Sequence, residues 1–215
     1  MDNTVSEVWK FLDSNPCIQR NLRQGLINSR ALSRFIIKNK KLNTSLDAVI
    51  SAIRRYNFGK EDNFHTTAYK LITKTINIST RIGLAEVTLI KDEDVQRLLP
   101  ELFNVIEYIR GDVLRVIQAN ESVRLVVDER NLENIVEIFP REKIIKIEKN
   151  VGEINMNMHP KMRTTHGILA MISNELAANG INIVEVMSCF PELLFFVHED
   201  DLVESYQILF NLCRN

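Results

Sequence analysis

The sequence contains few of the residues that mark disulfide-rich, metal-binding or fibrous proteins. Only 3 of its 215 residues are cysteines, and they form no C-x-x-C pair. This argues against a disulfide scaffold or a zinc ribbon and favours a reducing compartment. The chain also has only 7 glycines and 5 prolines, too few for a low-complexity or collagen-like protein.

Long apolar runs are missing as well. No stretch approaches the roughly 18 apolar residues that a membrane-spanning helix needs. Near the N-terminus, Asp2, Glu7 and Asp13 interrupt the basic-then-apolar pattern of a signal peptide. With 45% hydrophobic and 26% charged residues, the composition is that of an ordinary globular protein. We expect a cytoplasmic protein that makes no contact with a membrane.

The net charge of −1 conceals an uneven distribution along the chain. Residues 1–60 carry eleven lysines and arginines against four acidic residues, which gives +7, whereas the remainder carries −8. This division predicts that the two parts meet different partners and that the basic part faces a polyanion. The alternative is that the two halves merely attract each other.

Residues 1–60 show the apolar spacing of short helices, which are predicted over 4–13, 28–37 and 45–56. Two helices joined by a short turn behind a supporting helix resemble the helix-turn-helix regions of prokaryotic regulators. That resemblance implies contact with double-stranded DNA. The basic residues that would make this contact are Arg30, Arg34, Lys38, Lys40, Lys41, Arg54 and Arg55. Non-specific docking or dimerisation through the same unit is the alternative.

A connector is predicted over residues 61–81. Residues 57–63 are polar and are expected to form a loop. The pattern over 64–78 fits either a strand pair, as in the wing of a winged helix, or a linking helix.

Residues 82–150 and 151–215 repeat one order of elements. In the first copy the pattern predicts strand, helix, strand, strand, helix and strand, over 84–90, 92–110, 113–118, 122–128, 132–139 and 144–147. The second copy predicts a strand, a helix, two strands and a helix, over 153–158, 167–179, 181–189, 193–198 and 202–212. Its fourth strand is either missing or supplied from elsewhere. The repeat predicts an α+β chain with two ferredoxin-like βαββαβ modules and antiparallel sheets.

The second copy resembles the ACT domain, a βαββαβ module that binds amino acids in many metabolic enzymes and regulators. The resemblance rests on residues 165–172, on 176–183 with its Gly-Ile-Asn-Ile end, and on 198–202, and it is closest to the regulatory modules of aspartokinases. The first copy has the same order but lacks the glycine-containing turn. Too few residues remain outside the two copies for a kinase domain.

The resemblance implies that an amino acid or similar effector binds where the loop after the first strand meets the first helix. The corresponding residues are Arg163, Thr164, Thr165, His166, Gly167 and Asn182. Backbone N–H groups at a helix N-terminus suit a carboxylate, and Gly167 permits close backbone approach. His166 departs from the family, which commonly has proline there. The alternative is that Gly167 is only a turn residue and that Asn182 pairs only with its own backbone.

No sequence motif indicates catalysis, a metal or a cofactor. The four histidines are far apart in sequence, and G-x-S-x-G and P-loop signatures are absent. We therefore predict a regulatory protein rather than an enzyme, in which the ACT-like modules bind an effector and pair into a homodimer while the basic unit contacts DNA. One alternative regulates a metabolic enzyme in trans without DNA. Another assigns effector binding to the second copy alone.

Overall fold

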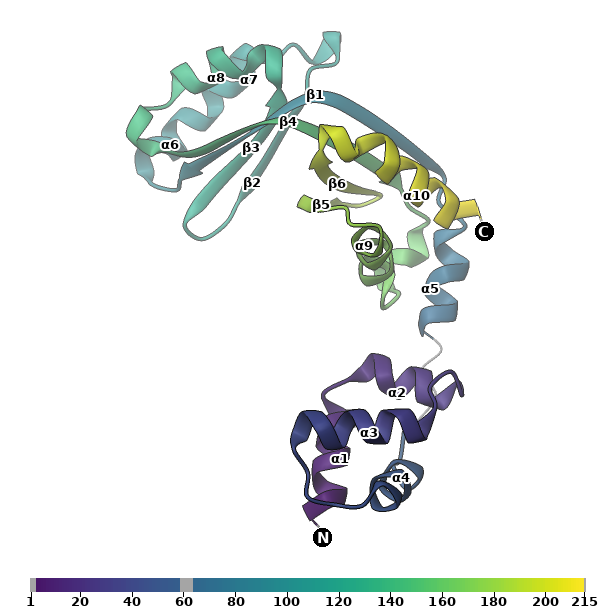
Figure 1. The fold of residues 1–215 in the computed structure, drawn as a ribbon. Helices are drawn as coiled ribbons and strands as arrows, with labels where there is room; N and C mark the ends of the chain where they lie inside the picture. Colours follow the sequence, from purple (N-terminus) through teal and green to yellow (C-terminus); the bar gives the residue numbers. More distant parts are fainter. Residues whose placement is uncertain (1–2, 59–63, 215) are drawn as a thin grey trace. The chain divides into compact units, whose positions relative to one another are not determined.

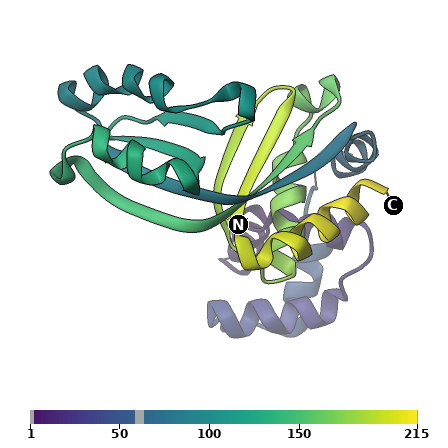
Figure 2. The same cartoon turned by 90° about the horizontal axis from the view of Figure 1, so that it is seen from above.

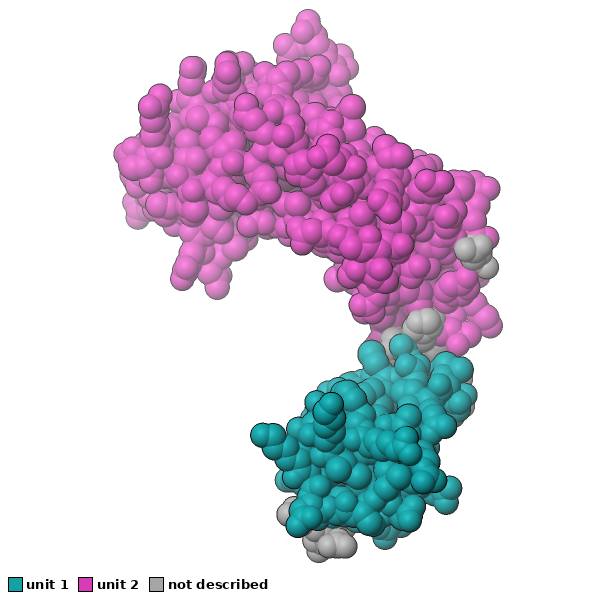
Figure 3. Space-filling view, in the orientation of Figure 1, with its two compact units in different colours: residues 1–62 teal, residues 63–215 magenta. Residues whose placement is uncertain are grey.

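The computed structural model describes residues 3–58 and 64–214, and the chain divides into two compact units, 1–62 and 63–215 (Figure 3). Most of the predicted loop 57–63 and the predicted boundary after residue 60 lie outside the described residues. The two units are considered separately below.

The first unit is helical over its described residues (Figure 1). Its helices are α1 (Asn3–Asp13), α2 (Pro16–Arg23), α3 (Ser29–Lys40) and α4 (Leu46–Arg54). Asn28 caps α3 by accepting hydrogen bonds from the backbone N–H groups of Arg30 and Ala31, and the Ser45 hydroxyl caps α4 in the same way. Such caps satisfy donors that would otherwise lack partners at a helix start.

Apolar residues of α1, α3 and α4 form the core of this unit, which includes Val8, Leu12, Ile36, Val49 and Ile53. The helices lie close to the ranges that the apolar spacing predicts. Their use as a helix-turn-helix stays a prediction.

The second unit is a mixed α+β structure built on one six-stranded antiparallel sheet. Its strands are β1 (Asn77–Ile90), β2 (Leu114–Gln118), β3 (Ser122–Asp128), β4 (Ile144–Asn157), β5 (Ile183–Cys189) and β6 (Glu192–His198). Its α-helices are α5 (Phe64–Ile72), α6 (Glu93–Leu98), α7 (Leu102–Val105), α8 (Leu132–Ile138), α9 (Ile168–Ala178) and α10 (Leu202–Arg214). The strand order is β2-β3-β1-β4-β6-β5.

Two long strands, β1 and β4, run side by side through both halves of this sheet (Figures 1 and 2). Residues 84–90 of β1 pair with β3 on one side and with β4 on the other. Residues 77–81 of β1 pair with residues 153–157 of β4, which in turn pair with β6. Residues 77–81 therefore take the position of the fourth strand that the sequence did not show for the second copy.

The predictions for several elements were wrong in extent. The helix expected over 92–110 is broken into α6, two short 3-10 turns and α7, and Pro100 lies at the first break. Proline has no N–H for a helical hydrogen bond, so it interrupts the ladder. The strands expected over 144–147 and 153–158 are one strand, β4. Asn150 adopts a left-handed conformation with φ of 58° within it.

The structure also decides between a strand pair and a linking helix for the connector. Residues 64–72 form helix α5, and β1 begins at Asn77, well before the predicted start at residue 84. A strand pair over 64–78 is therefore wrong, and the linking helix is partly confirmed.

Helices cover one face of the sheet in two groups. α6, α7 and α8 pack on β1 and β3 around Val87, Leu125 and Ile135. α5, α9 and α10 pack on β4 and β6 around Ile172 and Phe195. The two groups correspond to two apolar cores that share the long strands.

The opposite face of the sheet carries a third apolar cluster, with Leu84, Val126, Val151 and Phe196 among its members. Ion pairs border this cluster, and two of them join strands that are not neighbours in the sheet. Arg115 of β2 pairs with Glu153 of β4 at 3.2 Å.

Arg124 of β3 pairs with both Glu86 of β1, at 3.2 Å, and Glu185 of β5. β3 and β5 are far apart in the strand order. Their ion pair therefore shows that the sheet curls and that its two halves face each other.

Candidate functional site

The predicted effector loop follows β4 and leads into α9. Residues Pro160–Thr164 form a 3-10 turn, and the Thr165 hydroxyl donates to the backbone carbonyl of Lys161 at 2.8 Å. Gly167 is the N-cap of α9 and has a φ of 84°, in the left-handed region that favours glycine. No described side chain caps the first turn of α9. Its backbone N–H groups are therefore not satisfied from within the loop.

A cavity of about 1050 Å³ opens beside this loop. Its lining residues are Met158, Met162, Arg163, Thr165, Gly167, Ile168, Leu169, Ala170, Val186, Ser188, Phe190 and Leu193. The structure thus brings Arg163, Thr165 and Gly167 together at one cavity. Thr164, His166 and Asn182 are exposed and do not line it.

Arg163 is the one charged residue among those that line the cavity. Its guanidinium lies over the ring of Phe190, with 5.8 Å between the Cζ atom and the ring centroid. Phe190 belongs to the turn between β5 and β6. The cation–π contact holds the positive charge near the cavity while leaving its N–H groups free to donate.

The corresponding loop of the first copy, between β1 and α6, is built differently. The Asp92 carboxylate accepts a hydrogen bond from the backbone N–H of Val95 at 3.0 Å and pairs with Lys143. The hydrogen bond from Lys143 lowers the pKa of Asp92 below its ordinary value, with a further contribution from Val95. Helix α6 therefore carries its own anion where α9 carries none.

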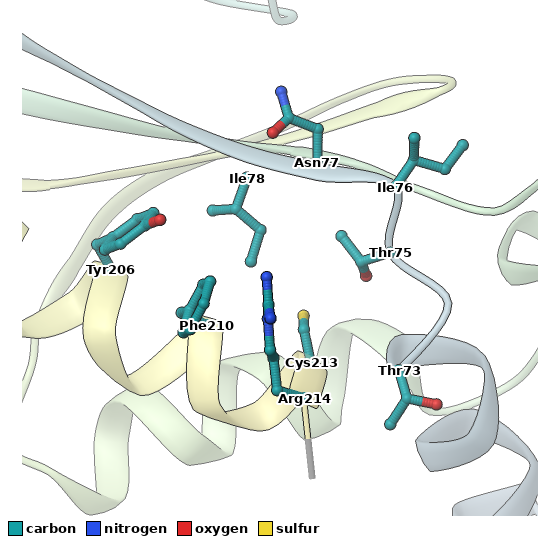
Figure 4. Close-up of a pocket in the computed structure, with 9 residues that line it drawn as sticks. All are labelled: Thr73, Thr75, Ile76, Asn77, Ile78, Tyr206, Phe210, Cys213 and Arg214. Carbon is teal, nitrogen blue, oxygen red and sulfur yellow. The ribbon is translucent and has the colours of Figure 1, made fainter.

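A second cavity, of about 580 Å³, lies between α10 and the start of β1 (Figure 4). Tyr206, Phe210 and Arg214 of α10 point toward Asn77 and Ile78 of β1. The Tyr206 and Phe210 rings stack with centroids 5.8 Å apart, and the Arg214 guanidinium lies 4.5 Å from the Phe210 ring centroid. None of the predicted site residues lines this cavity.

The seven basic residues expected to contact DNA all lie on described parts of the first unit and are exposed. Arg30, Arg34 and Lys38 follow one another at four-residue spacing on α3, which places them along one side of the helix. Lys40 and Lys41 are at the C-terminal end of α3. Arg54 and Arg55 are at the C-terminal end of α4.

Within residues 3–58 and 64–214, no helix is both long and apolar enough to cross a membrane. No group of three or more His, Cys, Asp or Glu side chains in the same residues is placed to hold a metal ion.

Comparisons with known proteins find similarity at the level of structure alone. No family profile and no curated protein sequence matches the chain. An aspartate kinase from Clostridium acetobutylicum, described as an important allosteric enzyme, matches with a TM-score of 0.53 and 17% identity over 64% of this chain. The regulatory subunits of aspartate kinase from Thermus thermophilus and Thermus flavus match over 64% of this chain and 97% of theirs. Their TM-scores are 0.51 and 0.52, each with 12% identity.

The fold is ACT-like. The expected resemblance to aspartokinase regulatory modules is thereby confirmed for the fold, while the matched region spans only 34% of the Clostridium enzyme. Fold similarity at this identity does not transfer an activity.

Sequence reasoning missed the half of the cavity that β5 and β6 contribute. Val186, Ser188 and Phe190 line it from the second strand pair, about twenty residues beyond the loop. The pattern at 190–192 indicated only a turn between strands. The pairing of β4 with β6, which local periodicity does not report, sets Asn157 opposite Glu192 and so brings that turn to the loop that contains Arg163.

Proposed function

We propose that this protein is a ligand-sensing regulator whose ACT-like unit binds an amino acid or similar small carboxylate at residues 163–167. The observation that carries this proposal is the cavity beside the loop, with Arg163 as its one charged lining residue. Concave, largely apolar sites with a few convergent polar groups are the usual form of small-molecule sites. The ACT-like fold and its occurrence in an allosteric aspartate kinase support the proposal.

A carboxylate has two groups of donors at this position. The Arg163 guanidinium offers a charge-assisted hydrogen bond. The uncapped N–H groups at the start of α9, an 11-residue helix, offer further donors together with the positive end of the helix dipole. At α6 the side chain of Asp92 already fills the corresponding place. We therefore assign effector binding to the second copy and a structural role to the first.

The test is a thermal-shift measurement on the full chain against all twenty amino acids. A ligand that binds only the folded state adds about 2.7 kcal/mol of stability at a hundred times its dissociation constant. We expect at least one amino acid to raise the midpoint. Arg163→Met should weaken that shift, whereas Arg141→Met, at an exposed arginine in the same unit, should leave it unchanged. A flat panel for the unmodified protein would refute the proposal.

Regulation follows if the effector binds two arrangements of the protein with different affinities. We propose that these arrangements belong to a homodimer formed through the sheet. Residues 77–81 of β1 and 144–149 of β4 each have one edge without a described strand partner, and such edges invite pairing. Sedimentation velocity should give a mass of twice 24.9 kDa. A monomer at micromolar concentration would contradict this part of the proposal. No catalytic role is assigned to the chain.

DNA binding is the second candidate function, and the row of Arg30, Arg34 and Lys38 on α3 favours it. Phosphate contacts from such a row give affinity that falls steeply with salt. We expect the double variant Arg30→Ala/Arg34→Ala to weaken duplex binding, measured by fluorescence anisotropy, and to flatten its salt dependence.

The control for this measurement is Lys70→Ala/Lys74→Ala, which removes two exposed charges from the second unit. Equal affinities of both variants and the unmodified protein would exclude docking through α3. Regulation of a metabolic enzyme in trans, without DNA, would then remain as the proposed way in which the effector signal is used.

A further inference from the structure

The lining residues of the cavity beside α9 favour one class of carboxylate ligand over others. We propose that its ligand carries an uncharged, apolar side chain, so that the effector is an apolar amino acid or a close analogue rather than a cationic or acidic one. This inference rests on the proposed function and specifies the ligand class of the same site.

The walls of the cavity are apolar from both sides. Met158, Met162 and Leu169 line it from the end of β4, the loop and α9, and Val186, Phe190 and Leu193 line it from β5, β6 and their turn. The hydroxyls of Thr165 and Ser188 are uncharged, and Thr165 already donates to Lys161. A hydrocarbon side chain in this space removes apolar surface from water on both sides at once.

The charges of the cavity fix the orientation of a ligand and disfavour a charge on the ligand's side chain, which lies between the apolar walls. Arg163 can pair with one carboxylate. No aspartate or glutamate is among the lining residues, so a lysine-like ammonium would lose water without gaining a counter-ion. A second carboxylate on the ligand would lie against apolar walls, with the one cation already engaged.

A matched set of probes tests this inference by isothermal titration of the full chain. L-norleucine has the carbon chain of L-lysine without the terminal ammonium, and L-2-aminoadipate carries a terminal carboxylate on the same chain length. We expect norleucine to bind at least about tenfold more tightly than either charged probe, because burying an unpaired charge is costly. Norleucine amide, which lacks the carboxylate, should bind more weakly than norleucine.

Two variants link the preference to the cavity. Arg163→Met should weaken binding of norleucine and leave the amide unaffected. Ser188→Asp places a carboxylate at an exposed lining position and should narrow or reverse the preference for norleucine over lysine. Circular dichroism melting of both variants checks that they fold.

The outcomes separate the ligand class from the function. Lysine or aminoadipate binding as tightly as norleucine would overturn the apolar class and leave ligand sensing intact. If small polar amino acids bind and norleucine does not, the apolar class is likewise wrong and ligand sensing stands. If no carboxylate binds at all, both the class and the proposed function are wrong.

Discussion

Helix α5 and the first residues of β1 should be indispensable to the ACT-like unit, although they precede both sequence repeats. The perturbation is a chain that begins at Ile82, compared with one that begins at Asn63, the first residue of the compact unit. The shorter chain lacks α5 and residues 77–81, which are the strand next to β4 in the second half of the sheet.

The loss of stability in the shorter chain can be estimated from the side chains that these residues bury. Leu71 is 8% exposed and Ile72 is fully buried, both in the core with α9 and α10. Burial of such side chains is worth about 1.5–3 kcal/mol each, so the two together contribute about 3–6 kcal/mol. The loss of backbone pairing with residues 153–157 adds to this. A domain of this size has a total stability of about 5–15 kcal/mol.

Urea denaturation followed by far-UV circular dichroism measures the difference. We expect the longer chain to unfold cooperatively, and the shorter chain to unfold at much lower urea or to lack a cooperative transition. Ile72→Ala in the full chain is the single-residue version and should cost about 2–5 kcal/mol. Equal midpoints and equal m-values for the two chains would refute the assignment of residues 77–81 to the sheet.

Three further predictions concern single side chains. Gly152→Ala would bring its Cβ atom within 2.9 Å of the Leu202 side chain, and the overpacking should lower stability by about 1–3 kcal/mol in urea titrations. Burial raises the pKa of the Cys213 thiol. Iodoacetamide at pH 8 should therefore alkylate Cys213 more slowly than the exposed Cys189. Mass spectrometry follows both rates, and equal rates would contradict this. Burial also raises the pKa of Glu86 above that in the unfolded chain, which makes its contribution to stability decline as pH rises through the folded pKa. Because burial outweighs the attraction of Arg124, Glu86→Gln should gain stability relative to the unmodified protein as pH rises above the ordinary range of a carboxyl group. A difference in urea midpoints that does not change with pH would count against this reasoning.

Much of the fold could be predicted from local patterns. Alternating and helical apolar spacing located β2, β3, α8 and α10 closely, because each is amphipathic and its apolar residues recur without interruption. Where the pattern failed, a non-local or backbone cause was responsible. Pro100 divides a stretch whose apolar residues continue at helical spacing on both sides, and the polar Lys149-Asn150 pair hides a strand that continues through a bulge.

Residues 77–81 illustrate a different limit. Their sequence, Asn-Ile-Ser-Thr-Arg, has one apolar side chain and gives no strong strand pattern. They form a strand because residues 153–157 of β4, far along the chain, have one edge without another partner. Tertiary pairing can override weak local propensity in this way.

The candidate site could be predicted in part. Gly167 and Arg163 follow from the resemblance and from the chemistry of helix N-termini, and both line the cavity. His166 and Asn182 are exposed and do not line it. Phe190, which contacts Arg163, lies in a turn whose position depends on the pairing of β6 with β4.

The shared strands limit how a signal from the cavity can travel within the unit. The α9 loop follows β4, and β4 continues without a break into the half that contains α6 and α8. On the face away from the helices, Arg124 joins Glu86 of the first half to Glu185 of β5, the strand that also contributes Val186 to the cavity. A ligand that shifts β5 would therefore act on a partly buried cluster of Glu185, Arg124 and Glu86, of which Arg124 and Glu86 lie in the first half. Coupling between distant sites can be carried by packed side chains and salt-bridge networks, and β4 together with the Arg124 ion pairs forms such a network between the two halves.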